Sequence, residues 1–167
     1  MARLTSYQNS AYASRYREKL DSLIAVDTDA GQHLSRAVAR YLYKMMAIKD
    51  EYEVARLYTD GRFANALSAQ FEGDVSISYH LAPPMFSGTD PVTGRPKKAV
   101  YGSWVKPVMS VLASCKSLRG TVFDLFGYTA ERKAERAARK RYEALVDEVA
   151  ARLTAANYKA AVQLVSV

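Results

Sequence analysis

The chain has 167 residues and a mass of 18.6 kDa, which is the size of one ordinary globular domain. Hydrophobic residues make up 49% of it and charged residues 25%, so a mainly disordered chain is excluded, because enough apolar surface exists to offset the entropy lost on folding. The formal net charge of +7 favours an anionic partner without naming one. The single cysteine, Cys115, excludes a disulfide framework, a thiolate-held iron–sulfur cluster and a cysteine-rich zinc site.

The sequence lacks the features of a membrane or secreted protein. No apolar run reaches the roughly 18–20 residues that a membrane-spanning helix needs. The first residues turn polar at once and lack the apolar core of a secretory signal. With so little cysteine as well, we expect a reducing, cytoplasmic location and no membrane partner.

Two helices are expected in the first third of the chain. Apolar residues recur at three- and four-residue spacing from 5 to 26, with Thr5 as the expected N-cap. The run 27–31, which contains two aspartates and a glycine, breaks this helix. The strongest helical signal follows over 34–58, and a helix of that length would be about 37 Å long. We therefore expect it to form the centre of the domain.

The middle of the chain predicts a short helix and a hairpin. The helix is expected over 62–72. From 74 to 81 apolar and polar residues alternate, which predicts a half-buried strand. Two prolines end this strand, since neither can donate to a ladder. After a loop over 87–98, residues 98–101 are expected to return as the second strand of an antiparallel pair.

The last third of the chain predicts three more helices. The first, over 104–118, has Ser103 as its expected cap and an inner face made of Trp104, Val108, Val111, Leu112, Cys115 and Leu118. A structured loop over 119–128 is expected to pack its apolar side chains inward. Thr129 is expected to cap a helix that runs to about 153 and buries a stripe made of Ala134, Ala138, Tyr142, Leu145, Val149 and Leu153. A last short helix, capped by Thr154, is expected in the tail.

Together these elements predict a mainly α (α+β) fold. It is expected to be a multi-helix domain around a long central helix, with a small antiparallel β hairpin. The sequence contains no internal repeat, low-complexity stretch or interdomain linker. The whole chain, 1–167, is therefore expected to form a single domain.

Residue types that commonly carry catalysis are few and do not converge in the sequence. His33 opens a helix and His80 lies on the polar face of the strand, and neither has metal-ligand spacing to another histidine, cysteine or carboxylate. Cys115 lies in an apolar stripe, where a small buried hydrophobe is its ordinary role. Neither of the glycine patterns GxGxxG and GxxxxGK[ST] occurs. The sequence therefore predicts no catalytic, cofactor-binding or metal-binding residue.

Two basic clusters are the candidate partner or anion surfaces. The loop cluster, in a segment stiffened by proline and glycine, consists of Arg95, Lys97 and Lys98. The helix cluster consists of Arg132, Lys133, Arg136, Arg139, Lys140 and Arg141. A solvated face is the ordinary role of such cations, and docking to an acidic protein or binding of nucleic acid or lipid are the alternatives. The tyrosines, 12 in number, mostly fall at helical core spacing, which indicates amphipathic core and interface residues.

Five runs of the sequence carry a resemblance to a known family. They are Ala39–Gly61, Gln70–Asp74, His80–Pro84, Asp90–Lys98 and Leu118–Arg132. In order and spacing the match covers about 4–153, nearly the whole chain. It resembles the C-terminal region of the fused indolepyruvate ferredoxin oxidoreductases, which are 2-oxoacid:ferredoxin oxidoreductases.

The resemblance implies a role within a larger enzyme system. That family oxidatively decarboxylates aryl 2-oxoacids to acyl-CoA, with thiamine diphosphate as cofactor and ferredoxin as electron acceptor. Its thiamine diphosphate site and other catalytic domains lie upstream of the matching region, so no catalytic or cofactor residue is carried over to this chain. Thiamine diphosphate and iron–sulfur clusters are implied for the parent system alone. The chain is then expected to be a non-catalytic accessory domain, a fragment or split subunit of that enzyme.

Three functional hypotheses follow. The favoured one is an accessory domain that packs on the catalytic domains of the parent oxidoreductase or supports a homodimer. The second is a cationic docking module for acidic ferredoxin or for the phosphates of CoA, using either basic cluster. The third is a small independent nucleic-acid-binding protein, which the absence of a fitted recognition element disfavours.

Overall fold

The computed structural model describes residues 1–73, 75–82, 88, 91, 94 and 97–166. It confirms a mainly α, α+β fold, in which helices dominate and one antiparallel hairpin is present. The chain divides into two compact units, which are described separately below. Unit 1 comprises 1–48 and 127–167, and unit 2 comprises 49–126. The single accessory domain over 1–167 stays a prediction.

Unit 1 begins with two helices where one was expected. They are α1 (Ala2–Tyr7) and α2 (Ser10–Ile24). The side chain of Asn9 caps α2 by accepting a hydrogen bond of 2.8 Å from the backbone N–H of Tyr12. The predicted continuous helix from a Thr5 cap is therefore wrong. Thr5 lies inside α1, and the apolar spacing continues across the Asn9 break because both helices bury residues in the same core.

The predicted long central helix is also two helices. The first, α3 (His33–Met46), ends at Ala47, whose φ and ψ of −110° and 64° are not helical. The second, α4 (Glu51–Thr59), starts at an Asp50 cap that accepts a hydrogen bond of 2.8 Å from the N–H of Glu53 and belongs to unit 2. The expected 34–58 helix is wrong because Asp50, with Glu53 three residues later, has the spacing of a capping box.

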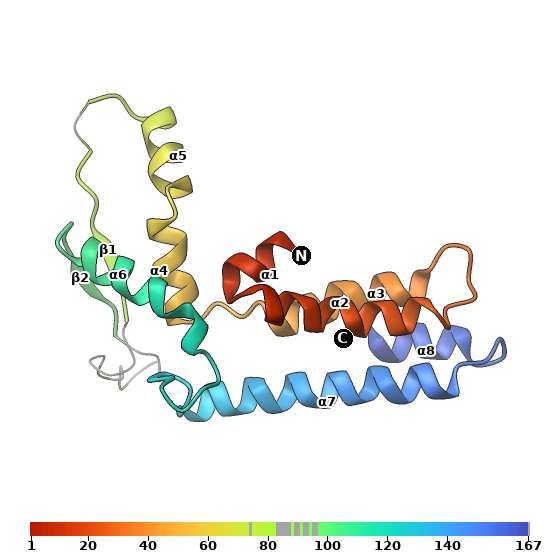
Figure 1. Ribbon diagram of the computed structural model, residues 1–167. Helices are drawn as coiled ribbons and strands as arrows, with labels where there is room; N and C mark the ends of the chain where they lie inside the picture. The colour runs from red at the N-terminus through yellow and green to blue at the C-terminus, as the bar shows by residue number, and fades with distance from the viewer. Residues whose placement is uncertain (74, 83–87, 89–90, 92–93, 95–96, 167) are drawn as a thin grey trace. The chain divides into compact units, whose positions relative to one another are not determined.

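The remaining helices of unit 1 are α7 (Ala130–Arg152) and α8 (Tyr158–Val165), which pack with α3 (Figure 1). The Thr129 cap is confirmed, since its side chain accepts a hydrogen bond from the backbone of the first turn of α7. The last helix starts later than Thr154, after an Asn157 cap position. The fully buried side chains of unit 1 come from all five of its helices and include Leu4, Leu23, Leu34, Val38, Leu42, Met46, Val146 and Val165.

The predicted buried stripe of α7 is correct only in its C-terminal half. Tyr142 and Val149 are buried, with Val146 as an additional core residue. Ala134 and Ala138 are exposed, which contradicts the prediction. In the first turns of α7 the half-buried side chains are arginines instead. The long apolar stem of an arginine covers part of the core, which a small alanine side chain would not reach.

Polar contacts fasten the helices of unit 1 to one another. Ion pairs of 2.6 Å between Arg15 and Glu143 and of 2.5 Å between Lys19 and Asp147 join α2 to α7. Tyrosine hydroxyls donate hydrogen bonds to backbone carbonyls of other elements, as the amphipathic character of these residues predicts. Tyr12 donates to the carbonyl of Met46, Tyr16 to that of Ala39, and Tyr142 to that of Val165.

Asp27 organises the start of α3. Its carboxylate accepts hydrogen bonds from the N–H and hydroxyl of Ser35, at 2.9 and 2.6 Å, and from the hydroxyl of Tyr158 at 2.9 Å. The Tyr158 oxygen in turn accepts from the N–H of Leu34 at 3.1 Å. Desolvation alone would raise the pKa of Asp27, but the hydrogen bonds outweigh it and hold the pKa below its usual value.

Unit 2 contains α4, α5 (Arg62–Gln70), β1 (Tyr79–Leu81), β2 (Ala99–Tyr101), α6 (Val105–Ser114) and a short 3-10 helix, η1 (Cys115–Leu118). The predicted antiparallel hairpin is confirmed, with Tyr79 opposite Tyr101 and Leu81 opposite Ala99. The first strand is shorter than predicted over 75–81, and residue 74, where the predicted strand begins, lies outside the described residues. In this register the residues before Tyr79 would face the segment after Tyr101, where the chain already turns into α6.

The core of unit 2 lies between α4, α6 and the hairpin. Its buried members are Ala55, Tyr79, Val105 and Met109. The predicted inner face of α6 is wrong in part, because Trp104, Val108 and Val111 are exposed, whereas Leu112 packs against this core as predicted. This helix has two apolar stripes, and periodicity alone does not say which of them meets the core. In the part of the chain that is described, no helix combines the length and apolar character needed to cross a membrane.

The lowered pKa of Asp27 makes a pH-dependent prediction. A carboxylate whose pKa is lowered by folding stabilises the folded state above its unfolded pKa, and this contribution is lost as the pH falls through the folded pKa. We expect Asp27→Asn to lower the free energy of unfolding by about 1 kcal/mol at pH 7, because Asp27 is only partly shielded from water. The difference from the wild type should shrink below about pH 4.

Urea unfolding followed by circular dichroism at pH 7, 5, 4 and 3 measures this difference. Asp21→Asn is the matched control, since Asp21 is an exposed carboxylate in an i,i+4 pair with Arg17. A wild-type advantage over Asp27→Asn that stays constant from pH 7 to pH 3 would contradict the assignment.

Candidate functional site

The loop cluster of cations is exposed where the structure describes it. Lys97 and Lys98 precede β2, and both side chains are exposed. The backbone N–H of Lys97 donates a hydrogen bond of 2.8 Å to the carbonyl of Gly88. The third predicted member, Arg95, lies outside the described residues. Lys97 and Lys98 therefore remain available to an anionic partner.

The helix cluster is divided between internal and external roles. Arg132 pairs with Glu135 at 2.5 Å, and Arg136 donates to the carbonyl of Gly127. Arg139 donates a hydrogen bond of 2.7 Å to the hydroxyl of Tyr12, above whose ring its guanidinium lies. Arg136 and Arg139 thus attach the start of α7 to other parts of unit 1, whereas Arg132 pairs within the helix. The exposed cations of the cluster are Lys133, Lys140 and Arg141.

The sequence predicts no catalytic or metal-binding role for the two histidines and the single cysteine. His33 is exposed and its Nδ1 lies 2.6 Å from the Asp29 carboxylate, an exposed pair at the start of α3. His80 is exposed on β1, opposite Val100. Cys115 is half-buried at the start of η1. Among the described residues, no three histidine, cysteine or acidic side chains form a group that could hold a metal ion.

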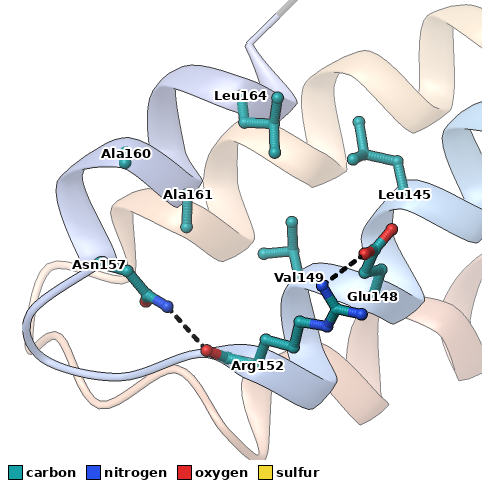
Figure 2. Close-up of a pocket in the computed structure, with 8 residues that line it drawn as sticks. All are labelled: Leu145, Glu148, Val149, Arg152, Asn157, Ala160, Ala161 and Leu164. Atoms are coloured by element: carbon teal, nitrogen blue, oxygen red, sulfur yellow. Dashed lines mark hydrogen bonds and ion pairs between the residues drawn. The ribbon is translucent and has the colours of Figure 1, made fainter.

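An open groove of about 390 Å³ lies between the C-terminal half of α7 and α8 (Figure 2). Val149, Ala161 and Leu164 point toward one another across it, which gives it an apolar floor. The rim of the groove is polar. The side chain of Arg152 pairs with Glu148 at 3.0 Å, and the backbone carbonyl of Arg152 accepts a hydrogen bond from the side chain of Asn157. The polar groups of this rim, Glu148 and Arg152, are therefore paired with each other.

The feature of unit 2 that sequence reasoning missed is an apolar surface on α6. Trp104, Val108 and Val111 are 64%, 57% and 67% exposed. Their spacing of four and three residues places them on one face of the helix, which we call the α6 outer face. The opposite stripe of α6, with Val105 and Met109, is buried, so the orientation of the helix is set by its packing.

A second apolar surface lies on the loop after η1. Val122, Phe123 and Leu125 are each at least 70% exposed, and we call them the loop triplet. They were expected to pack inward, and this prediction is wrong. Asp124 and Phe126 take the inward positions instead: Asp124 is buried, and the ring of Phe126 meets that of Tyr52 edge-on at 5.3 Å.

Buried polar contacts hold this loop on α4. The Nε and Nη2 atoms of Arg119 donate to the two oxygens of Asp50 at 2.5 and 2.7 Å, with both side chains less than 10% exposed. The carboxylate of Asp124 accepts from the hydroxyl of Tyr52 at 3.2 Å and from the N–H of Gly120 at 2.8 Å. Gly120 has a φ of 73°, which glycine adopts without steric cost.

Tyr52 lies at the centre of these contacts. Burial, reinforced by the neighbouring Asp124 carboxylate, raises the pKa of Tyr52 to about 12. The Arg119 guanidinium lies over its ring at 5.2 Å from the ring centre. A neutral tyrosine held in this way donates a hydrogen bond and packs, so its role is to position the loop. The same contacts keep the loop triplet turned outward.

The Arg119–Asp50 pair makes a stability prediction for unit 2. Removing one member of a buried pair leaves the other charge without its partner, so Arg119→Met should lower the free energy of unfolding by about 3–5 kcal/mol. Adding Asp50→Asn should recover part of this loss, because asparagine keeps an oxygen that can cap α4. Urea unfolding followed by circular dichroism and by the emission of Trp104 measures both changes.

Arg62→Met is the matched control. Arg62 pairs with Asp60 at 2.6 Å but is largely exposed, so its loss should change the free energy of unfolding by less than about 1 kcal/mol. Equal effects of the two arginine substitutions would show that the buried pair does not hold unit 2 together.

Comparison with known protein families identifies the family of the chain. No curated protein and no solved structure matches the chain. A family model described as a family of unknown function (DUF6537) matches residues 1–167. The match covers the whole length of the chain, and the chain therefore belongs to the DUF6537 family.

Proposed function

We propose that this chain is a non-catalytic accessory domain of an indolepyruvate ferredoxin oxidoreductase-like enzyme. The catalytic domains of such an enzyme would decarboxylate an aryl 2-oxoacid with thiamine diphosphate and pass the electrons to ferredoxin. In this proposal the chain packs against those domains and contributes no reacting group of its own.

One structural observation carries the proposal. Unit 2 exposes large apolar side chains on elements whose conformation is fixed by buried contacts, both on the α6 outer face and in the loop triplet. Contiguous exposed apolar side chains mark interaction sites, because isolated domains rarely leave them in water. The resemblance of the sequence to the C-terminal region of the oxidoreductases supplies the kind of partner.

The fixed conformation of the loop that carries the loop triplet favours a role in assembly. A loop that is ordered only on binding loses conformational entropy at that moment, and this loss weakens the complex. Here the Arg119–Asp50 pair and the hydrogen bonds of Asp124 order the loop within unit 2 itself. The loop triplet would therefore bind with little further loss of conformational freedom.

Size-exclusion chromatography tests the assembly role. The chain is mixed with the thiamine diphosphate-dependent catalytic domains of an indolepyruvate ferredoxin oxidoreductase. We expect the chain and the catalytic domains to elute together. The double substitution Phe123→Ser with Leu125→Ser should weaken their association by at least about tenfold, because it removes two exposed apolar side chains from the contact. Ile24→Ser, at an exposed apolar position of unit 1, is the matched control.

Two results would contradict the assembly role. One is independent elution of the chain and the catalytic domains at micromolar concentration. The other is turnover of a 2-oxoacid by the chain alone, which would place the chemistry in this chain.

A second candidate role is cationic docking of ferredoxin or of the phosphates of CoA. The observation that favours it is the exposure of Lys97 and Lys98, which form no ion pair with another described residue. Exposed cations of this kind raise association rates with anions and lose their effect as salt screens them.

Steady-state kinetics test the docking role in the assembled enzyme. We expect Lys97→Glu with Lys98→Glu to raise KM for ferredoxin or for CoA about fivefold at low salt, and we expect the effect to fade at high salt. Lys133→Glu with Lys140→Glu makes the same change of charge in the helix cluster and is the comparison variant. Unchanged KM values for both substrates at low salt would remove this candidate.

A further inference from the structure

The groove between α7 and α8, which we call the α7–α8 groove, is lined at a regular spacing on both sides. The lining residues are Leu145, Glu148, Val149 and Arg152 on α7, and Asn157, Ala160, Ala161 and Leu164 on the α8 side. Each set follows the order i, i+3, i+4, i+7, which is the pattern that one face of a helix presents to its neighbour. Both walls of the groove are therefore helix faces of the kind that pack against another helix.

The shape of the groove is that of a helix lying lengthwise. Seven positions separate the first and last lining residues of each wall, which corresponds to about 10.5 Å, or two helical turns. After a short connection α8 runs back along α7 (Figure 1), so the two walls lie along one direction. A groove with two such walls fits a third helix, whose axis would lie about 8–10 Å from each neighbour.

The apolar floor of the groove leaves room for the side chains of such a helix. Ala160 and Ala161 are small, so the middle of α8 forms a low wall. Val149 and Ala161 are buried, whereas Leu164 is 57% exposed where it borders the groove (Figure 2). An exposed leucine beside an apolar hollow is removed from water when another molecule fills that hollow, and this removal favours binding.

The α7 side of the rim carries one charge of each sign. Glu148 and Arg152 pair at 3.0 Å, and their side chains are 56% and 77% exposed. An exposed pair of this kind contributes little to stability, so either group can pair with another molecule instead. The α8 side of the rim is uncharged, since Asn157 and Ala160 line it. A helix in the groove would therefore meet a carboxylate and a guanidinium on one flank, four residues apart.

The complement of this groove is a convex helix face. Two copies of the chain related by a two-fold axis would place groove against groove, and two hollows cannot fill each other. A small molecule would leave part of the walls unused, since both repeat the helical spacing over two turns. An amphipathic helix, in contrast, presents a ridge of side chains that enters such a groove.

We propose that the α7–α8 groove binds an amphipathic helix of a partner protein. Apolar side chains of this helix, at i, i+3 or i+4, and i+7, pack on Val149, Ala161 and Leu164. On the flank that meets α7 the helix carries a basic residue for Glu148 and an acidic residue for Arg152. This inference concerns unit 1 and does not depend on the role proposed for the loop triplet of unit 2.

Peptide titration followed by methyl NMR tests this occupant. The intact chain is labelled with ¹³C at its leucine and valine methyl groups. Two helical peptides of 18 residues share one leucine stripe, carry Glu and Lys four residues apart on one flank and glutamines on the other, and differ only in the order of the two charges. We expect both peptides to shift the methyl signals of Leu145, Val149 and Leu164. Their Kd values should differ at least about threefold in 20 mM NaCl, because only one order matches the rim charges.

Variants of the chain separate the apolar and the charged contributions. Ala160→Phe should weaken binding of both peptides at least about tenfold, because the ring occupies the groove. Ala151→Phe is the matched control, since Ala151 is an exposed alanine of α7 that does not line the groove. Glu148→Arg with Arg152→Glu exchanges the two rim charges and should reverse the preference between the peptides. Circular dichroism checks that each variant is folded.

Four results would overturn the inference. The first is the absence of a shift in the three methyl signals with either peptide, and the second is an equal effect of Ala160→Phe and Ala151→Phe on Kd. The third is a preference between the peptides that is absent or that the charge exchange does not reverse. The fourth is a shift of the same methyl signals when the concentration of the chain alone is raised, which would assign the groove to a second copy.

Discussion

The arrangement of unit 2 depends on one buried carboxylate, that of Asp50. It caps α4 at its N-terminus, and its two oxygens accept hydrogen bonds from the Nε and Nη2 atoms along one edge of the Arg119 guanidinium, although 69 residues separate the two. Because both groups are shielded from water, each requires the other. The segment that follows α6 is thereby attached to the first turn of α4, and the direction of the loop triplet follows from this attachment.

Much of the fold could be predicted from local signals. The Thr129 cap, the alternation before Leu81 and the return strand near Val100 each rest on a short pattern with one physical meaning, and the structure contains the corresponding cap and hairpin. The break near Asp50 had a local signal as well, but the apolar spacing on either side continued through it. Periodicity shows that apolar residues recur at helical spacing, but it does not show whether the backbone between them is helical throughout.

The surface could not be predicted in the same way. On α6 both the Val105 stripe and the Val108 stripe are apolar, and the choice between them depends on the contact with α4 across a long sequence separation. On α7 the role of each cation depends on what its side chain contacts. Arg139 donates a hydrogen bond to the hydroxyl of Tyr12, whereas Lys140 is exposed to solvent. Composition identifies a basic and apolar chain, and tertiary structure decides which of those groups a partner can reach.

The division of the chain has a consequence for its biosynthesis. Unit 2 is one continuous stretch, whereas the core of unit 1 joins α3 to α7 and α8, which are synthesised after unit 2. Leu34 and Leu42 can therefore be buried only after Val146 and Val165 have been synthesised. Unit 2, in contrast, is complete once Phe126 has left the ribosome. Unit 2 can fold first, and its compact form shortens the effective loop that unit 1 has to close.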